Sequence, residues 1–428
     1  MNINVTKKSE APGGMKQILA TFKPPEGNAR ALVASEPFWG TVISWYNLYG
    51  PLYMVALGVS KTQVGLITAI GLTVQVLAAL LGGYFSDHFG RKRTMQIADA
   101  VGWVIPSIIW LSARSTIHFF LAAALNGLFH AAVPAWGCLL VEDTKPEKRQ
   151  PIYAMVQMMF VGSGLLVPIG GLLVKRWGII TGGRIIYGLG LVLILCAIAI
   201  RQRGVEESSI GQDIAGISGG SPKETLEEFI QALRMLKDSP TIFILFLVQT
   251  LAMFSASIRN VYSAIYMTDS VGLGLSPSVI ALVPATISAT MILMLVLFVP
   301  RLRPEHANWG LQIGAFGFTI GSLAMLLAPP NLMLFPLISS ICIGFGTAIF
   351  EPIRQASLAN AIPDRSRAKM NSVIAVFTLI STIPAGPAAG LMYKLNPRLP
   401  FAAVTILYIV VQFLILQLGK GKPHAGQD

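Results

Sequence analysis

The sequence predicts an all-α integral membrane protein, with twelve transmembrane helices in two pseudo-symmetric six-helix bundles. Three observations lead to this fold class: the composition, the number of long apolar runs and an internal repeat. Of the 428 residues, 54% are hydrophobic and only 12% are charged. A soluble domain carries about a quarter charged residues, so this composition is typical of a polytopic membrane protein.

Long apolar runs divide the chain into twelve segments that can each cross a bilayer. A spanning helix needs about 20 mostly apolar residues. Most connectors are short, which predicts that successive helices are antiparallel neighbours. The runs cover residues 37–58, 63–86, 95–113, 116–140, 151–174, 181–200, 240–267, 277–300, 308–328, 332–357, 370–393 and 399–418.

The runs predict five regions along the chain, with a long polar linker between two sets of six helices. Residues 15–22 have apolar side chains at helical spacing, which predicts a short amphipathic helix on the membrane surface. A capping-box pattern at 221–224 predicts an amphipathic helix within the linker. The regions are a cytoplasmic N-terminal segment at 1–36, an N-terminal bundle at 37–200, a cytoplasmic linker at 201–239, a C-terminal bundle at 240–418 and a cytoplasmic tail at 419–428.

The distribution of basic residues predicts the orientation. Of the 32 Lys and Arg residues, 23 lie in the termini and in the connectors on the same side, whereas 7 lie on the opposite side. The positive-inside rule then places both termini in the cytoplasm, in a cytoplasmic (plasma) membrane. Topology and anionic inner-leaflet lipid account for the net charge of +12, so we expect no nucleic-acid partner. The first 30 residues are polar, so no secretory signal is expected.

The two halves of the chain repeat each other. Residues 46–54 and 259–267 share Asn, Tyr, Tyr and Met at the same positions, and proline and glycine matches follow in the same helix order. Two six-helix repeats in parallel are the plan of a secondary transporter, with the solute site at the interface between the halves.

The connector between the second and third runs carries a specific motif. It reads Gly-x-Phe-x-Asp-x-Phe-Gly-Arg-Lys-Arg from residue 83 to residue 93. With the twelve spans and the repeat, the chain resembles the major facilitator superfamily, 12-helix type, from about residue 36 to 418. The resemblance implies a gating role for Gly83, Asp87, Gly90, Arg91, Lys92 and Arg93.

The gating motif suggests an asymmetric latch. The resemblance implies that Asp87 and Arg91 clasp the N-terminal bundle against the cytoplasmic end of helix 11. The matching connector at 299–304 keeps basic residues but lacks the acid and the glycine. Proton antiporters of the superfamily often have an arginine in helix 4 where this chain has Ala123. This departure argues against a drug:proton antiporter.

Polar side chains within the apolar runs are the candidates for the solute site. A charge at the bilayer centre costs about 2.5–3.5 kcal/mol on insertion scales, so it normally faces a cavity or a partner. The resemblance implies that helices 1, 4, 7 and 10 line the central cavity. The candidates on these helices for solute binding are Tyr46, Asn47, Tyr49, Asn126, Trp136, Arg259, Asn260, Tyr262 and Arg354, and those for proton coupling are Glu351 and His130.

Each candidate also has a purely structural interpretation. Glu351 and Arg354 lie one turn apart and can neutralise each other. His130 can be a satisfied interior histidine, and the tyrosines can be packing residues. Asp99 is interpreted as interfacial, and Glu36 as a favourable charge in the first turn of helix 1. Helices 5 and 11 carry proline and glycine positions that suit helix packing or gating: Pro168, Gly171, Gly386, Pro387 and Gly390.

Other chemistries have no support in the sequence. No P-loop, no metal-ligand spacing and no nucleophile elbow is present, so we expect no cofactor, no metal and no enzyme activity. Three cysteines at 138, 196 and 342 fall inside apolar runs and are interpreted as small buried hydrophobes.

The hypothesis is therefore a monomeric secondary active transporter of a small organic solute, with protons and membrane lipid as its other partners. It works by alternating access and is coupled to protons. The arginines within helices favour a small organic anion or zwitterion. One alternative is an exporter of amphipathic drugs with the same fold. Another is a non-transporting membrane sensor or scaffold, although the short tails leave no room for a signalling domain.

Overall fold

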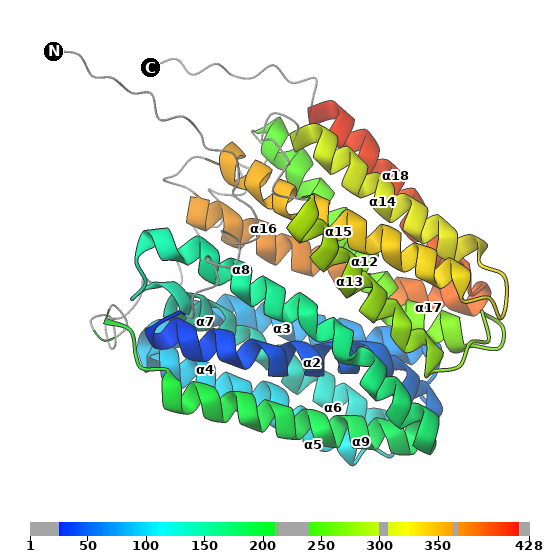
Figure 1. Ribbon diagram of the computed structural model, residues 1–428, viewed down its shortest axis with the longest axis horizontal. Helices are drawn as coiled ribbons and strands as arrows, with labels where there is room; N and C mark the ends of the chain where they lie inside the picture. Colours follow the sequence, from blue (N-terminus) through cyan, green and yellow to red (C-terminus); the bar gives the residue numbers. More distant parts are fainter. Residues whose placement is uncertain (1–24, 210–211, 213–238, 299–306, 363–366, 419–428) are drawn as a thin grey trace.

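The computed structural model describes residues 25–209, 212, 239–298, 307–362 and 367–418. Throughout these ranges the regular structure is helical. The expected amphipathic helices at 15–22 and after residue 221 lie outside the described residues. Figure 1 shows two groups of long helices, the N-terminal half in blue to green and the C-terminal half in green to red.

The N-terminal half contains long helices that change winding partway. Its first two spans are continuous helices, whereas a π-helical turn interrupts the third span and 3₁₀ turns interrupt the fourth and fifth. Its elements are α2 (Gly27–Ala56), α3 (Lys61–Phe89), α4 (Arg91–Asp99), η1 (Ala100–Val104), α5 (Ile105–Leu111), α6 (Thr116–Gly127), η2 (Leu128–Ala131), α7 (Ala132–Val141), α8 (Pro146–Ser163), η3 (Gly164–Leu166) and α9 (Val167–Gly204).

The C-terminal half repeats this plan. Its fifth span is again broken near the middle, between α16 and α17. Its elements are α12 (Pro240–Thr268), η4 (Val279–Ala281), α13 (Leu282–Leu297), α14 (Ala307–Leu327), α15 (Leu334–Ala361), α16 (Arg367–Thr382), α17 (Ala385–Leu395) and α18 (Leu399–Leu418).

Ten helical stretches in the described residues are long and apolar enough to cross a membrane. One of them, Pro151–Gly204, folds back at Gly178, whose φ of 73° interrupts the helix, so it contains two of the expected spans. The helix α2 is 30 residues long but is rich in tyrosine and tryptophan, and it is not among the ten. The helical architecture is therefore consistent with the twelve expected spans.

The first helix begins earlier than the sequence predicted. It starts at Gly27 instead of residue 37. Ala29, Leu32 and Val33 are buried in a cluster with α4 and α7, so packing continues the helix beyond the apolar run. The residues before the expected boundary at 36 thus belong in part to the N-terminal bundle.

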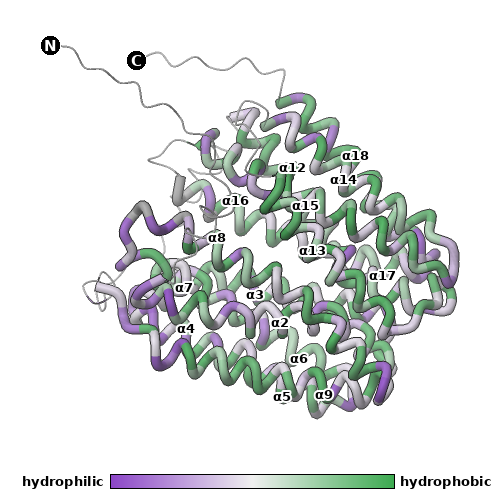
Figure 2. The backbone as a smooth tube through the Cα atoms, in the orientation of Figure 1, coloured by the Kyte–Doolittle hydropathy of each residue, from purple (hydrophilic) through white to green (hydrophobic). Residues whose placement is uncertain are grey.

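The surface of the helices is apolar. Figure 2 shows hydrophobic residues along the helices and hydrophilic residues gathered towards their ends. Many leucines and isoleucines are more than half exposed, as expected for side chains that face lipid. Cys196 is likewise exposed, so the expectation that it is buried is wrong, while Cys138 and Cys342 are partly buried.

The two halves touch at the end of the bundle that carries Lys61, which we call the Lys61 end; the opposite end carries Arg91. There α17 lies against α3, as the right side of Figure 1 shows, and the backbones approach closely at Gly65 and Gly386. A Cβ added at Gly386 would lie 2.6 Å from the Gly65 carbonyl oxygen. Small residues allow such helix contact in membranes.

Of the remaining glycines predicted for helix packing, Gly390 lies at the same contact and Gly171 lies at a second contact between the halves, that of α9 with η4. A Cβ at Gly390 would lie 3.0 Å from Cα of Thr62, and one at Gly171 would lie 2.9 Å from Cβ of Ala281 on η4. Pro168 and Pro387 lie within the first turns of α9 and α17, where proline is tolerated. The packing at these glycines therefore joins the two halves, and we call the four glycines Gly65, Gly171, Gly386 and Gly390 the seam.

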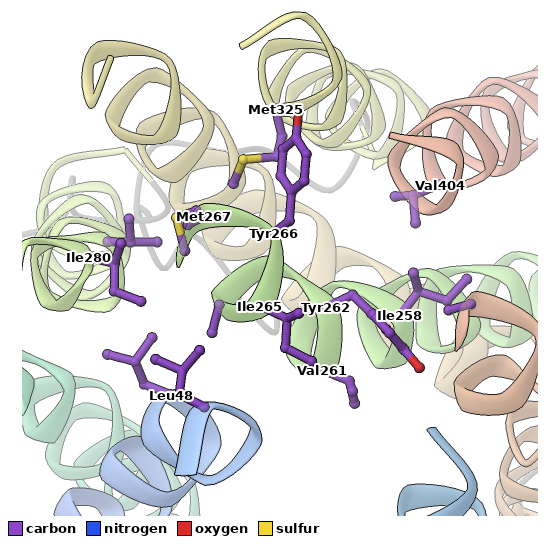
Figure 3. Close-up of a cluster of buried hydrophobic side chains, with 14 of the residues drawn as sticks. Leu48, Ile258, Val261, Tyr262, Ile265, Tyr266, Met267, Ile280, Met325 and Val404 are labelled. Atoms are coloured by element: carbon purple, nitrogen blue, oxygen red, sulfur yellow. The ribbon is translucent and has the colours of Figure 1, made fainter. Parts of the chain in front are cut away.

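Apolar side chains reinforce the seam. Figure 3 shows Leu48 of α2 facing the part of α12 that carries Val261 and Ile265, with Ile280 of η4 beside them. All four belong to one buried cluster that extends through both halves. The Lys61 end is therefore closed by continuous packing.

We predict that Gly65→Ala opens the Lys61 end. Its added methyl group would meet the Gly386 backbone, and overpacking of about 1–3 kcal/mol would raise access from that side about tenfold. The measurement is labelling of Ser257→Cys by an impermeant thiol reagent, with the three native cysteines replaced. Gly162→Ala is the matched control, because its Cβ would meet nothing within 4 Å. Equal labelling in the two variants would contradict the prediction.

Candidate functional site

A cavity of about 540 Å³ lies between the two halves. Side chains of α2, α3, η1, α5, α6, η2 and α9 form most of its wall, and α12 and α16 close it from the C-terminal half. Pockets for small organic ligands have volumes of about 300–1,000 Å³. The cavity therefore has the size and the interfacial position of a site for one small solute.

The polar lining of the cavity is uncharged. Among the described residues that line it there is no Lys, Arg, Asp or Glu. Amides and hydroxyls both donate and accept hydrogen bonds, so this lining suits a solute with several hydroxyl or carbonyl groups. The polar lining residues are Asn47, Thr68, Gln75, Ser107, Asn126, His130, Ser257, Asn260 and Thr382.

An aromatic cluster forms the wall on the side of the N-terminal half. The rings of Tyr46 and Tyr187 lie 4.1 Å apart, and Trp110 stacks on Tyr187 at 4.7 Å with an interplanar angle of 12°. The Tyr46 hydroxyl lies 3.2 Å from Oγ of Ser107. Trp103 also lines the cavity. Flat, rigid side chains of this kind provide an apolar surface on which a ring can stack.

The π-helical turn η1 orients one of these residues. In a π-helix the backbone bonds are shifted, and such turns occur often at functional sites. The Asn126 amide donates to the Gly102 carbonyl at 2.7 Å, which ties the third span to the fourth. A Cβ at Gly102 would lie 2.7 Å from Cβ of Phe129, so only glycine allows this approach. The turn carries Trp103 to the cavity.

His130 lies on the 3₁₀ turn η2 in the fourth span. The Gln75 amide of α3 donates from its Nε2 to Nε2 of His130 at 2.5 Å. Nδ1 of His130 is buried without a hydrogen-bond partner among the described residues. His130 is thus a titratable side chain on the cavity wall.

Five of the eleven sequence-predicted side chains line the cavity: Tyr46, Asn47, Asn126, His130 and Asn260. Tyr49 instead packs against Gly170 and Gly171 and is fully buried. Tyr262 donates to the Lys61 carbonyl at 2.9 Å, within the closed Lys61 end. Trp136 packs against a buried cluster near the Arg91 end.

The arginines point away from the cavity. Arg259 donates to the Tyr408 hydroxyl at 3.0 Å and lies 5.8 Å from the centre of the Phe318 ring, inside the C-terminal half. Arg354 is 8% exposed, donates to Oε1 of Gln249 at 2.5 Å and forms an ion pair with Glu351. The neutralising pair that the sequence left open is therefore formed. Neither arginine gives the cavity a positive charge.

The loop motif makes its contacts within the N-terminal half and the segment that follows α9. Arg91 forms an ion pair with Glu142 and donates to Oγ of Ser208 at 3.0 Å, and the Lys92 amide donates to Glu207 at 3.0 Å. These contacts hold the segment after α9 against the loop. None of these contacts is made with helix 11, and residues 363–366 directly before it lie outside the described residues, so the expected clasp stays a prediction.

The glycines of the motif differ in role. Gly90 has a φ of 85°, which L-residues rarely adopt, and it separates α3 from α4. A Cβ at Gly83 would meet nothing within 4 Å, whereas one at the neighbouring Gly82 would lie 2.8 Å from the Ala131 carbonyl oxygen. The close helix contact here therefore belongs to Gly82.

An ion pair bridges the halves at the Lys61 end. Lys61 at the start of α3 pairs with Asp269 after α12, and the Tyr393 hydroxyl of α17 donates to the same carboxylate at 2.7 Å. Burial acts to raise the pKa of Asp269, but the hydrogen bonds from Lys61 and Tyr393 outweigh it and lower this pKa. Asp269 therefore stays ionised and holds the closed end together.

Several lining residues were missed from the sequence. Gln75, Trp103, Ser107 and Trp110 come from the second and third spans, which the reasoning on helices 1, 4, 7 and 10 left out. α15, the tenth span, contributes no lining residue. Gln75 is a polar side chain in the middle of an apolar run, and this pattern could have identified it as a candidate lining residue.

Comparisons with known proteins agree with this architecture. The family model described as Major Facilitator Superfamily matches residues 38–333 and, in a second match, residues 245–427. The chain is 28% identical to the shikimate transporter of Escherichia coli (strain K12) over 233 residues, which are 46% of this chain and 51% of that protein. It is 27% identical to the gallate transporter of Pseudomonas putida over 137 residues, which are 32% of this chain and 30% of that protein. The chain thus spans about half or less of the length of these relatives.

Solved structures show the same fold at low identity. The nucleoside transporter NupG superimposes with a TM-score of 0.70 at 14% identity, over 93% of this chain and 100% of that one. The D-xylose-proton symporter superimposes with a TM-score of 0.69 at 14% identity, over 91% of this chain and 97% of that one.

We predict that Asp269→Asn weakens closure of the Lys61 end about two- to fivefold, as expected for a partly exposed ion pair. The measurement is labelling of Ser257→Cys from that side. Because the closed state lowers the Asp269 pKa below its ordinary value of 3.8, the ion pair contributes fully above that value and is lost as the pH falls through the lowered pKa. The ratio of labelling in Asp269→Asn to labelling in the parent protein should then be constant between about pH 5 and 8, because the thiolate fraction of the introduced cysteine changes with pH alike in both. A change in this ratio within that range would count against the assignment.

Proposed function

The chain belongs to the major facilitator superfamily. We propose that it is a multi-pass membrane transporter of small organic solutes and not an enzyme, and that it is a proton-coupled secondary transporter that works by alternating access. The named transporters that share sequence with it support this class. We further propose a plasma-membrane location with both termini in the cytoplasm, and a monomer in contact with lipid alone. The Lys61 end is then extracellular, and the closed seam corresponds to a protein that is shut towards the outside.

The observation that carries the choice of solute is the uncharged cavity with an aromatic wall. We propose a compact ring-bearing solute with several hydroxyl groups, whose ring stacks on Tyr46 and Trp110, both of which pack on the buried Tyr187. Asn47, Asn126 and Asn260 then hydrogen-bond its hydroxyl or carboxyl oxygens. The proteins that share sequence with this chain are named for shikimate and gallate, which supports this class.

The sequence led us to expect that Arg259 and Arg354 favour an anionic solute. Neither arginine lines the cavity, so these two residues do not provide that preference. A carboxylate on the solute would be bound by neutral amide and hydroxyl donors. The alternative of an amphipathic-drug exporter is disfavoured for cationic drugs, because no carboxylate is among the described lining residues.

Alternating access requires the seam to part. Opening would separate Gly65 from Gly386 and break the bridge between Lys61 and Asp269. We propose that the solute enters from the Lys61 end in that state and leaves at the Arg91 end when the seam re-forms. The motif around Arg91 would then contact helix 11 in the outward-open state only.

The test of the proposed function is uptake by cells with and without the protein. Radiolabelled shikimate, gallate, 3-(3-hydroxyphenyl)propionate and D-xylose form the panel. We expect accumulation of at least one hydroxylated ring compound that collapses when an uncoupler removes the proton gradient. Accumulation of lipophilic cations alone would favour the exporter, and no change for any compound would reject the solute class.

We predict that Asn260→Ala raises the apparent KM about tenfold, which corresponds to loss of one or two hydrogen bonds of about 0.5–1.5 kcal/mol each. Its neighbour Arg259 is the matched control. Arg259→Gln loses the bond to Tyr408 and should lower the melting temperature while leaving KM within about twofold. The opposite pattern, with KM sensitive to Arg259, would restore that arginine to the solute site.

We predict that His130→Gln uncouples uptake from the proton gradient, because His130 is the titratable side chain that meets the cavity. Gradient-driven accumulation in vesicles should fall about tenfold. Glu351→Gln should leave coupling unchanged and reduce stability, since Glu351 is paired with Arg354. Normal coupling in His130→Gln, with loss in Glu351→Gln, would reverse the two roles.

A further inference from the structure

A buried group of charges lies in the N-terminal half, away from the cavity and from the loop motif. Arg201 near the end of α9 donates from Nη1 to Oδ2 of Asp99 at 2.9 Å and from Nη2 to Oε1 of Glu36 at 3.2 Å. Its Nε donates to Oγ of Ser35 at 2.8 Å. All three charged residues are less than 8% exposed. Three spans therefore meet at one guanidinium. Glu36 lies well inside α2, which begins at Gly27, so its interpretation as a charge in the first turn of the helix is wrong. The interpretation of Asp99 as interfacial stays a prediction.

The charges of this group do not balance. The guanidinium carries one positive charge and does not deprotonate in proteins, whereas two carboxylates face it. With both acids ionised the buried group would carry one uncompensated negative charge, which is unfavourable away from water. Two acids that interact this closely share their protons as a pair. One bound proton makes the group neutral.

The geometry leaves a place for that proton. Asp99 is only 1% exposed, and its Oδ1 has no hydrogen-bond partner among the described residues. The ring of Trp39 covers the Arg201 guanidinium, with 4.9 Å from Cζ of Arg201 to the ring centre. Nε1 of Trp39 is also buried and has no hydrogen-bond partner among the described residues. A protonated Asp99 can keep its bond from Arg201 through Oδ2 and carry the proton on Oδ1.

The charges around the group do not supply the balance. Among the described residues, Arg201 acts on both acids and Asp99 acts on Glu36. On the elements packed against them, Arg91 is paired with Glu142 and His130 lies against Gln75. The other cations on α2, α4 and α9 near this end are exposed or partly exposed: Arg30, Lys92, Arg93 and Arg203.

From this arrangement we propose that Glu36, Asp99 and Arg201 form a proton-binding site that holds one exchangeable proton, separate from His130. The site is connected to the solute cavity through one short element. Asp99 directly precedes the π-helical turn η1, and that turn carries Trp103 to the cavity wall. Trp39 over Arg201 contacts Trp103 edge-on, with ring centres 5.2 Å apart.

This connection supplies a coupling mechanism, which rests on the proposed function. Protonation of Asp99 weakens its ion pair with Arg201, because one charge of the pair is removed. The change in Asp99 reaches Trp103 within four residues along η1, and solute on Trp103 acts back on Asp99 with the same coupling free energy. The proton thus favours one arrangement of the third span, and the solute favours the same one.

Infrared difference spectroscopy on the purified full-length protein in lipid nanodiscs tests the site without any solute. A protonated carboxylic acid gives a C=O stretching band that shifts in D₂O, whereas a carboxylate does not. At neutral pH we expect one such band that is lost in both Glu36→Gln and Asp99→Asn, since either leaves a balanced pair with Arg201. Glu206→Gln, which removes an exposed acid on the following segment, should retain it.

Glu36→Gln is close to isosteric, so it decides the question even if Asp99→Asn does not fold. A band that persists unchanged in Glu36→Gln, or no such band in the parent protein, overturns the proposal. His130→Gln should leave the band in place, which separates this site from the imidazole on the cavity wall.

Transport measurements in proteoliposomes test the coupling. The measurement uses a panel solute that the parent protein transports. Gradient-driven accumulation of this solute should be about tenfold lower in Glu36→Gln than in the parent protein. Counterflow without a gradient should stay within about twofold of the parent value. Full gradient-driven accumulation in Glu36→Gln would overturn the coupling. Failure of the proposed function has a different signature, because then no solute of the panel moves in the parent protein while the infrared result still stands.

Discussion

A charge inside a membrane protein needs a partner, and the structure depends on how this chain satisfies that requirement. The buried or partly buried arginines of the described chain find their partners inside the halves. Arg91 meets Glu142, Arg259 meets Tyr408 and the Phe318 ring, and Arg354 meets Glu351. Arg201 meets two acids. Because these partners lie within one half, each half can move as a unit without breaking them.

The same requirement leaves the cavity between the halves neutral. Amide and hydroxyl groups can release a solute more readily than a desolvated charge pair, since each hydrogen bond contributes little net free energy. A transporter must bind and release in every cycle, so such a lining is suited to turnover. The aromatic cluster adds contact area without a charge. Neutral groups of the cavity thus serve solute binding, whereas the ion pairs within each half keep that half rigid.

The seam has a different physical basis from the two halves. Helices associate in lipid mainly by close packing, because lipid tails are as apolar as leucine. The contact of Gly65 with Gly386 brings backbones together, and the Tyr262 hydroxyl donates to the carbonyls of Lys61 and Gly386 beside it. The bridge from Lys61 to Asp269 adds one ion pair at the rim. An interface of this kind is specific in the closed state.

The sequence by itself determined the fold class, the repeat and the family. Apolar runs and basic connectors are local properties, and each is read from about 20 consecutive residues. Residue type, depth in such runs and the resemblance to the family selected Tyr46, Asn47, Asn126, His130 and Asn260, which line the cavity. The pairing of Glu351 with Arg354 was also open to the sequence, because one helical turn separates them.

Only the tertiary structure decided which side of each helix faces the cavity. Arg259 and Asn260 are neighbours in the chain, yet one points into its own half and the other into the cavity. The rotation of a helix about its axis is set by packing against helices far away in sequence, and no local pattern reports it. The meeting of Glu36, Asp99 and Arg201 has the same origin, since these residues lie on three spans separated by up to 165 positions.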